Sequence, residues 1–448
     1  MKVGIDSITF DLPKIHLPIK TLAENRSIDP DKLIKGLGLQ KMSFPDVHQD
    51  VVTFATNAVY KLLIQENLNP DQISRIYVGS ESGIDASKPI ASYVLGLLEQ
   101  QFGDGTFNHC DVVDLTFACI GAVDALQNCL DFVKLNPDKK AIVVATDNAK
   151  YDLESGGEYT QGAGAIALLL TTNPRVLAFS NQYGVSSKGV FDFFKPRRYF
   201  SKNEILSTTD NPEWFGIVEN EIAFYKEQPV FDGHYSNQCY IDRIYDAYQH
   251  FKKNSKQTGP TYQNWENIVM HLPYCYQARR TFIEIYAQEQ FGLNSSDVDY
   301  KDQIKTISKS DDYLLFVNKT IYPSEIASAQ VGNLYTGSLF LALLSTLSYH
   351  LDKKHAIVGK KIGFIAYGSG SKSKVFEAEV QPDWQNAIST CYLFETLDNS
   401  IEIDFDTYLR LHKKEQKTAV CAPHNEFSLD YIENKNPLLL GARYYSFK

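Results

Sequence analysis

A cysteine at the start of a helix built from small residues is the first candidate for chemistry. Cys119 lies within the stretch 111–133, which is predicted to start as a strand and to become a helix rich in small residues. The positive end of a helix dipole and the free backbone N–H groups there favour the thiolate, which is the nucleophilic form of cysteine. The sequence therefore predicts an activated nucleophile at Cys119. The alternative is a buried structural cysteine, which is the commoner fate of this residue type.

A glutamate and a histidine occupy matching places in two buried strands. Glu81 lies near the end of the strand predicted over 74–82, and His271 lies similarly in the strand predicted over 266–274. Ligands bind at the carboxyl edge of open α/β sheets. We therefore expect Glu81 to act as a general acid/base and His271 to donate a hydrogen bond to a substrate carbonyl. The alternatives are an exposed glutamate at a strand end and a core histidine bonded to the backbone.

The remaining polar motifs are weaker. Asn333 opens a second helix of small residues, predicted over 331–351, where its amide is expected to contact a carbonyl oxygen unless it only caps the helix. The Gly/Ser turn at 367–371 has the spacing of neither dinucleotide-binding nor P-loop motifs, and no histidine pair has metal-site spacing, so no metal is expected. Cysteine, glutamate and histidine together predict acyl transfer through a thioester.

Short apolar strands alternate with helical patterns along the chain, which predicts a layered α/β fold. The order strand, then small-residue helix, occurs once with Glu81 and Cys119 and again with His271 and Asn333. We therefore expect two similar halves, 1–172 and 173–448. The polar and aromatic stretch near 192–262 is predicted to be a helical insertion in the second half.

Composition excludes several classes of protein. The 448 residues include 44 Lys and Arg against 54 Asp and Glu, so the net charge is −10, which argues against nucleic-acid binding. Seven cysteines without CxxC spacing predict free thiols in a reducing compartment. No apolar stretch reaches the roughly 18 residues that span a bilayer, and the N-terminus lacks a signal-peptide core. The sequence predicts a cytoplasmic protein without membrane contact.

Ordered motifs from residue 4 to residue 371 resemble those of the 3-hydroxy-3-methylglutaryl-CoA (HMG-CoA) synthase family. In chain order they are GIDSITFDLPK, LAENRSIDPDKLIKGLG, VHQDVV, ESGID, ACIGAVDALQ, ATDNAKY, SGGEYTQGAGA, FDFFKP, DGHYSNQCY, MHLPY, VGNLYTGSL and AYGSGS. The resemblance implies a thiolase-like fold, in which two similar halves form a layered αβαβα architecture.

The resemblance also implies the reaction, which joins acetyl-CoA to acetoacetyl-CoA in the mevalonate pathway of isoprenoid biosynthesis. Cys119 would carry the acetyl group, Glu81 would be the general acid/base, and His271 would polarise the acetoacetyl-CoA carbonyl. The substrate-binding residues implied in the same way are Asn333, Ser369, Asp147, Tyr151 and Lys32. CoA thioesters are substrates, so no cofactor is implied, and family members are typically homodimers.

Three positions depart from the family pattern. Ile120 follows Cys119 where the family usually has tyrosine, and Phe117 precedes the motif, so this apolar pair is expected to reshape the acyl pocket. Tyr276 replaces a lysine that holds CoA phosphates in the family.

Two basic stretches bear on the missing lysine. Arg279 and Arg280 are expected to compensate for it, whereas the KPRR run at 195–198 is interpreted as a solvated surface. If the CoA contacts are altered, the alternative is a relative that acts on carrier-protein-bound chains during β-branching. A ketoacyl synthase III-like enzyme, which has no glutamate in the place of Glu81, and a non-catalytic acyl-CoA-binding protein are further alternatives.

Overall fold

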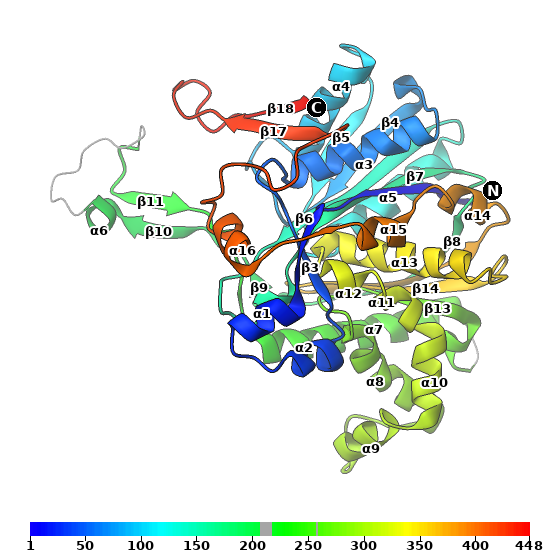
Figure 1. Ribbon diagram of the computed structural model, residues 1–448. Coiled ribbons are helices and arrows are strands. Elements are labelled where there is room, and N and C mark those ends of the chain that lie inside the picture. Colours follow the sequence, from blue (N-terminus) through cyan, green and yellow to red (C-terminus); the bar gives the residue numbers. More distant parts are fainter. Residues whose placement is uncertain (207–216, 257–258) are drawn as a thin grey trace.

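The computed structural model describes residues 1–206, 217–256 and 259–448, and its central element is a nine-stranded mixed sheet. The strands, in the order in which they lie side by side, are β13 (Trp265–Met270), β14 (Lys361–Gly368), β15 (Lys372–Val380), β8 (Leu177–Ser187), β1 (Val3–Asp11), β7 (Gly162–Thr172), β6 (Lys140–Ala149), β4 (Ile73–Gly79) and β5 (Asp111–Leu115). Both halves of the chain thus contribute to one continuous sheet (Figure 1).

The same pairing pattern occurs twice in this sheet. From β1 outward, the pairs β1–β7 and β7–β6 are antiparallel and the pair β6–β4 is parallel. From β8 outward, the pairs β8–β15 and β15–β14 are antiparallel and the pair β14–β13 is parallel. In the described residues, the second half has no counterpart of β5. The prediction of two similar halves is confirmed, whereas the boundary at 172/173, in the connection between β7 and β8, stays a prediction.

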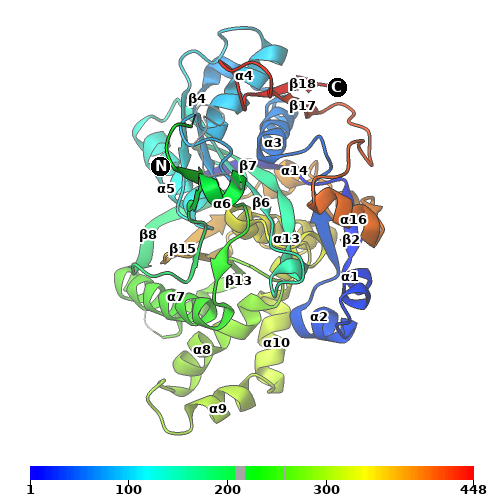
Figure 2. The same ribbon diagram turned by 90° about the vertical axis from the view of Figure 1, so that its left-hand side faces the viewer.

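Helices cover both faces of the sheet (Figures 1 and 2). Those that form the layers are α3 (Val51–Gln65), α4 (Ile90–Phe102), α5 (Gly121–Leu135), α7 (Gly233–Ser255), α8 (Gln277–Phe291) and α13 (Ser338–Asp352). Strand β6 shows the two faces: Ile142 and Val144 join the core cluster of α3 and α4, and Ala141 and Val143 join that of α5 and α13. Helix α7 packs on β8 and β15. The predicted thiolase-like layering is confirmed.

The remaining elements lie between or outside these layers. The strands are β2 (Ile15–Pro18), β3 (Lys41–Phe44), β9 (Phe193–Phe194), β10 (Arg198–Ser201), β11 (Glu221–Phe224), β12 (Val230–Phe231), β16 (Ile401–Glu402), β17 (Phe427–Ile432) and β18 (Arg443–Phe447). The helices are α1 (Ile19–Asn25), α2 (Pro30–Leu37), α6 (Lys202–Leu206), α9 (Tyr300–Ile307), α10 (Asp311–Thr320), α11 (Tyr322–Glu325), α12 (Ser328–Val331), α14 (Trp384–Ile388), α15 (Leu393–Asp398) and α16 (Phe405–His412), with short 3-10 turns at Pro70–Gln72, Glu158–Thr160, Thr261–Asn264 and Tyr335–Gly337.

The stretch near 192–262 differs from the predicted helical insertion. Its first part forms two small two-stranded sheets, β9 with β12 and β10 with β11, and the latter projects from the body with α6 (Figure 1). Its second part is α7, which packs on the central sheet and so belongs to the layered body. Adjacent aromatic residues in β9 and β10 favour strands in the first part, which the polar composition of the stretch concealed. Residues 207–216 and 257–258 of this prediction lie outside the described residues.

None of the helices in the described ranges combines the length and apolar character needed to cross a bilayer. All seven cysteines are free thiols, as predicted.

Candidate active site

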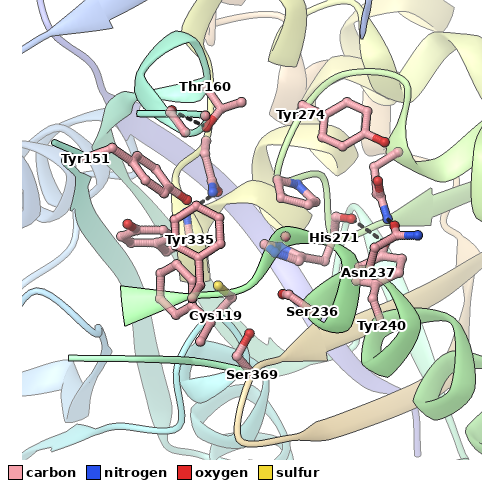
Figure 3. A pocket seen from close by; sticks show the side chains of 18 of the residues that line it. Cys119, Tyr151, Thr160, Ser236, Asn237, Tyr240, His271, Tyr274, Tyr335 and Ser369 are labelled. Carbon is pink, nitrogen blue, oxygen red and sulfur yellow. Dashed lines mark hydrogen bonds between the residues drawn. The ribbon is translucent and has the colours of Figure 1, made fainter. Parts of the chain in front are cut away.

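Five of the predicted residues line one cavity with an empty volume of about 990 Å³. They are Cys119, Tyr151, His271, Asn333 and Ser369. Cys119 precedes α5 and Tyr151 follows β6, so the first half supplies these two, whereas His271 follows β13 and Ser369 follows β14 in the second half. Figure 3 shows Cys119, His271 and Ser369 grouped around the same space. The cavity is therefore built jointly by the two halves.

Cys119 and Glu81 form a direct hydrogen bond. The Cys119 Sγ lies 2.9 Å from the Glu81 Oε1, so the thiol donates to the carboxylate. Burial, and then the nearby Glu81 carboxylate, raises the pKa of the Cys119 thiol well above its usual value. The expectation that the helix dipole stabilises a thiolate is therefore wrong, because burial and a neighbouring negative charge outweigh it. Glu81 is placed to accept the thiol proton.

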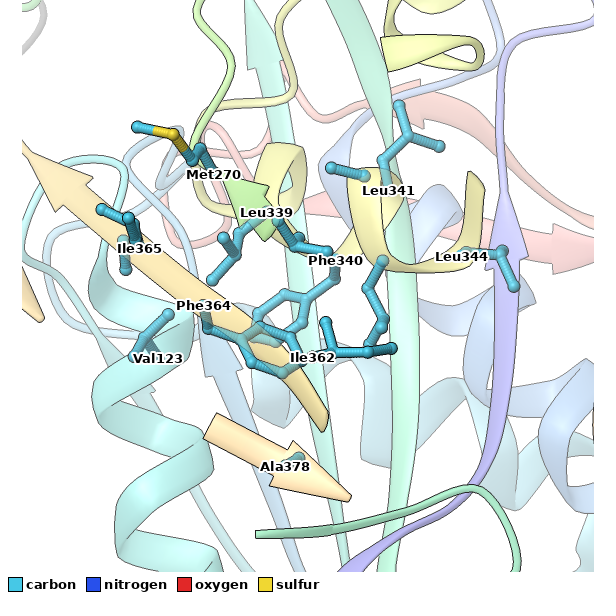
Figure 4. Close-up of a cluster of buried hydrophobic side chains, with 14 of the residues drawn as sticks. Val123, Met270, Leu339, Phe340, Leu341, Leu344, Ile362, Phe364, Ile365 and Ala378 are labelled. Atoms are coloured by element: carbon cyan, nitrogen blue, oxygen red, sulfur yellow. The ribbon is translucent and has the colours of Figure 1, made fainter. Parts of the chain in front are cut away.

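Close packing of α5 against β4 sets the position of Cys119. Ala118, directly before the cysteine, has a φ of 39°, which turns the chain sharply into the helix. A Cβ on Gly79 at the end of β4 would lie only 2.2 Å from the backbone nitrogen of Ala122 in α5, so glycine is needed there. Deeper in the core, Val123 of α5 lies in the same cluster as Phe340 of α13 (Figure 4). The helix that follows the cysteine is thus fixed on several sides.

A buried lysine pairs with the other oxygen of Glu81. The Lys195 Nζ lies 3.3 Å from the Glu81 Oε2, and the side chains of the two residues are 9% and 6% exposed. The ammonium also lies 4.3 Å from the ring centroid of Tyr335. Burial lowers the pKa of Lys195, but Glu81 and then Tyr225 outweigh it, so the pKa lies above its ordinary value and the lysine is charged. The interpretation of 195–198 as a solvated surface is therefore wrong for Lys195.

Asp147 positions other residues and does not line the cavity. Its Oδ1 accepts hydrogen bonds from the Ser80 hydroxyl, the Glu81 N–H at 2.9 Å and the Ser82 hydroxyl at 2.7 Å. Its Oδ2 accepts from the N–H of Thr336 at 2.9 Å and from the Thr336 hydroxyl. Burial, and then Glu81, raises the pKa of this carboxyl to about 6. Because both oxygens are taken by protein donors, the predicted substrate contact is replaced by a link between the two halves.

His271 is buried and presents a free ring nitrogen. Burial lowers its pKa to about 3, so the imidazole is neutral. Its backbone is held by a bond to the Ile365 carbonyl and by the Tyr240 hydroxyl, which donates to the His271 carbonyl at 2.6 Å. No hydrogen-bond partner of the ring Nδ1 is present in the part of the chain that the structure describes. The backbone therefore aims this ring into the cavity, and the ring stays available for a ligand.

Aromatic rings pack on one side of the thiol. Tyr151 and Tyr335 lie in the same small cluster as Cys119, and their ring centroids are 6.3 Å apart. Phe193 of β9 and Phe231 of β12 complete it, each within 6.4 Å of Tyr151. This apolar surround is one reason why the thiol stays protonated. Phe193, Phe231 and Lys195 are functional candidates that sequence reasoning missed, although the motif FDFFKP contains two of them.

The side-chain oxygen of Asn333 is used in local hydrogen bonds. Its Oδ1 accepts hydrogen bonds from the Tyr335 N–H at 2.8 Å and from the Ser338 hydroxyl at 3.0 Å. The oxygen thus organises the turn before α13, as the capping alternative requires. The residue nevertheless lines the cavity beside Tyr151, which leaves its amide N–H₂ group as the donor for a carbonyl oxygen.

The two departures near the nucleophile do not reach the cavity. Ile120 is fully buried, and its Cγ2 lies against Gly368 of β14, where an added Cβ would be 2.7 Å away. The Phe117 ring lies 4.0 Å from the Lys372 Nζ. Neither side chain therefore contacts the cavity directly, and the expectation that the pair reshapes the acyl pocket stays a prediction.

Tyr276 and Arg279 are also occupied elsewhere. The Tyr276 ring stacks against the Arg279 guanidinium at 3.9 Å, and this guanidinium pairs with Glu325, whose side chain is 1% exposed. The expectation that Arg279 compensates for the missing lysine is therefore not supported, because its guanidinium is paired with the buried Glu325.

Arg280 and Lys32 lie in or beside α2, although neither lines the cavity. Arg280 donates to the Gly36 carbonyl of α2 at 2.7 Å, and the neighbouring Leu37 lines the cavity. The exposed Lys32 lies four residues before Gly36, on the same face of α2. The predicted roles of Arg280 and Lys32 in CoA binding both stay predictions.

Within the described ranges, no group of three or more His, Cys, Asp or Glu side chains has the arrangement of a metal site. The cavity and its surroundings bring together a thiol, a carboxylate and a neutral imidazole, which are groups able to support nucleophilic and acid–base chemistry.

Comparison with known proteins identifies the family. Models of the N-terminal and C-terminal parts of hydroxymethylglutaryl-coenzyme A synthase match residues 1–175 and 219–428. The hydroxymethylglutaryl-CoA synthase of Haloferax volcanii is 31% identical over 439 residues, covering 92% of this chain and 90% of the relative. That of Enterococcus faecalis is 31% identical over 408 residues, covering 91% of each chain.

Solved structures of similar proteins have the same fold as this chain. A MvaS in complex with 3-hydroxy-3-methylglutaryl coenzyme A is 26% identical with a TM-score of 0.82, covering 100% of this chain and 99% of that one. The HMG synthase of the curacin biosynthetic pathway is 19% identical with a TM-score of 0.79 over the whole of both chains, and it shares the fold. The chain belongs to the hydroxymethylglutaryl-CoA synthase family.

Proposed function

We propose that this protein condenses acetyl-CoA with acetoacetyl-CoA to give HMG-CoA and free CoA in the mevalonate pathway. The observation that carries the proposal is the hydrogen bond between the Cys119 thiol and Glu81 beside a cavity that also presents the neutral His271 ring. Family membership supports it, and solved relatives hold HMG-CoA and CoA.

The first step is acetyl transfer to Cys119. Glu81 accepts the thiol proton as the sulfur attacks the acetyl-CoA carbonyl, and the C–S bond to CoA then breaks. The proton returns from Glu81 to the departing CoA sulfur. The step therefore needs no prior thiolate, which agrees with the raised pKa of Cys119.

Condensation and hydrolysis follow. Glu81 removes a methyl proton from the acetyl group on Cys119, and the resulting carbanion attacks the ketone carbonyl of acetoacetyl-CoA. The neutral His271 ring donates a hydrogen bond to that carbonyl oxygen, which ends as a hydroxyl with the proton from Glu81. Water then cleaves the thioester to Cys119, releasing HMG-CoA and restoring the thiol. Asn333, Ser369 and Tyr151 line the space where the acetoacetyl group would lie.

A product assay tests the proposal. Purified protein is incubated with both CoA thioesters, and HMG-CoA and acetyl-enzyme are measured by mass spectrometry, beside Cys119→Ala and Glu81→Gln. We expect HMG-CoA from the wild type, no acetyl-enzyme from Cys119→Ala, and a loss of condensation of roughly 10²- to 10⁴-fold in Glu81→Gln. Condensation that survives Glu81→Gln would favour the ketoacyl synthase III-like alternative. Folded wild type that never becomes acetylated would favour the non-catalytic alternative.

We propose CoA rather than a carrier protein as the acyl carrier. The relatives at 31% identity carry the name of the CoA enzyme. Of the departures that favoured a carrier protein, Phe117, Ile120 and Tyr276, none lines the cavity. Comparing kcat/KM for acetyl-CoA with that for an acetylated carrier protein tests the choice, and a preference for the carrier protein refutes it.

We further propose a cytoplasmic homodimer that needs no metal or organic cofactor. Rat and mouse relatives, 27% identical over 85% of this chain, are described as cytoplasmic. Light scattering is expected to give about twice the chain mass of 50.7 kDa. Activity is expected to survive dialysis against a chelator, and its loss would contradict the proposal.

A further inference from the structure

We infer that Lys195 is a positioning residue for the condensation, and that its ammonium, paired with one oxygen of Glu81, holds the other oxygen toward the Cys119 thiol. The inference rests on the function proposed above. It concerns a side chain that lies behind the general base and does not line the cavity that contains Cys119 and His271.

The two oxygens of Glu81 have separate partners. Oε1 accepts the Cys119 thiol at 2.9 Å, and Oε2 faces the Lys195 Nζ at 3.3 Å. The same ammonium donates to the backbone carbonyl of Glu81 at 3.3 Å, while the Glu81 N–H is held by Asp147. The backbone of Glu81 and one of its carboxylate oxygens are therefore both held by protein groups. The other oxygen, Oε1, faces Cys119 and is the one that would exchange protons with it.

Lys195 is itself held in place. Its side chain is 9% exposed, and its ammonium lies 4.3 Å from the ring centroid of Tyr335 and 6.0 Å from that of Phe193. Both distances are within the range of cation–π attraction. Lys195 directly follows β9 (Phe193–Phe194), which pairs with β12. This short two-stranded sheet therefore fixes the position of the lysine backbone. The cation is thus positioned before any substrate binds.

Among the charged groups around Glu81, Lys195 is its counter-ion. Asp147 and Tyr225 also act on the ammonium, and Asp147 acts on Glu81 as a like charge. Asp85 and Arg197 line the second cavity, of about 1160 Å³, that Glu81 and Lys195 share. Among the described residues, Lys195 alone forms an ion pair with Glu81.

The physical consequence follows from burial. A buried carboxylate without a counter-ion is strongly disfavoured and takes up a proton instead. A protonated Glu81 accepts a proton neither from the thiol nor from the acetyl methyl group. Loss of the ammonium should therefore confine activity to higher pH without weakening substrate binding.

The test compares pH profiles of kcat and KM for wild type, Lys195→Met and Lys195→Arg, with Lys252→Met as control. Lys252 pairs with Glu289, whose side chain is 2% exposed, in a pair outside the cavity. We expect the acidic limb of kcat in Lys195→Met to move up by roughly one to two pH units, with KM little changed. Lys195→Arg should keep the limb near that of the wild type, and Lys252→Met should not move it. Should Lys195→Met fail to fold, Lys195→Gln carries the same prediction.

A double variant supplies the second readout. If Lys195 acts through Glu81, then adding Lys195→Met to Glu81→Gln should lower activity no further. The inference is overturned if the acidic limb of the kcat–pH profile of folded Lys195→Met is not shifted, or if only KM changes. It is also overturned if the losses of activity in the double variant are additive. Wild type that makes no HMG-CoA would instead reject the proposed function, so the two failures are distinguishable.

Discussion

A single methyl group between β4 and α5 should disconnect the nucleophile from its base. In Gly79→Ala, the new Cβ would lie 2.2 Å from the Ala122 nitrogen and 2.3 Å from its Cα. Ordinary contacts between such atoms are roughly 3.5 Å, so one backbone must retreat by about 1 Å. Since Cys119 lies two residues before α5, this shift lengthens its 2.9 Å hydrogen bond to Glu81.

The magnitude follows from two general effects. Overpacking of this kind costs about 1–3 kcal/mol of folding free energy. A displacement of about 1 Å at reacting groups lowers rates roughly 100-fold. We therefore expect Gly79→Ala to unfold at a lower temperature and to form acetyl-enzyme about two orders of magnitude more slowly than the wild type.

The assay is rapid quenching followed by mass spectrometry of the acetylated protein, with thermal unfolding measured in parallel. Gly96→Ala is the matched control, because Gly96 lies within α4 and a Cβ there meets nothing within 4 Å. That change should raise stability by up to about 1 kcal/mol and leave acetylation unchanged. Wild-type acetylation and an unshifted unfolding temperature in Gly79→Ala would refute the reasoning.

Two further predictions concern buried ionisable groups. Because the pKa of the Cys119 thiol is raised well above its usual value, alkylation by iodoacetamide in the absence of substrate should rise about tenfold per pH unit without a plateau by pH 9, as peptide mass spectrometry can check; a plateau near neutral pH would contradict it. Arg279→Met leaves the Glu325 carboxyl, whose pKa burial already raises, without its cation, and should cost about 3–5 kcal/mol at neutral pH. Since the folded state then retains a proton that the unfolded state releases, this deficit should shrink as the pH falls toward 5 in urea unfolding, and an equal deficit at both pH values would show that the cation is dispensable.

The positions of Cys119, Glu81 and His271 could be predicted because each depends on a local pattern. Glu81 and His271 each follow closely on a buried strand, β4 and β13, whereas Cys119 lies between the edge strand β5 and the small-residue helix α5. The repeated order of strands and small-residue helices likewise predicted two similar halves, which the matching strand pairing confirms.

The predictions that were wrong or incomplete concerned contacts between segments that are distant in the sequence. Lys195 stands in a run of charges, and sequence alone does not show that one member of such a run is buried against Glu81. The protonation of Cys119 was misjudged because the dipole is visible in a helical pattern, whereas the neighbouring carboxylate comes from another strand. The bonds that Asp147 makes were not predictable from local sequence, because its donor Thr336 lies 189 residues away in the chain.

The hydrogen bond from Cys119 to Glu81 also bears on how this protein survives oxidants. Peroxides attack thiolates, and the first product, a sulfenic acid, passes on to forms that cells rarely repair. At 9% exposure and with its proton held, the resting thiol offers peroxides little to react with. Because a thiol that keeps its proton reacts with peroxides more slowly than a thiolate does, the same hydrogen bond should also protect Cys119 from oxidation.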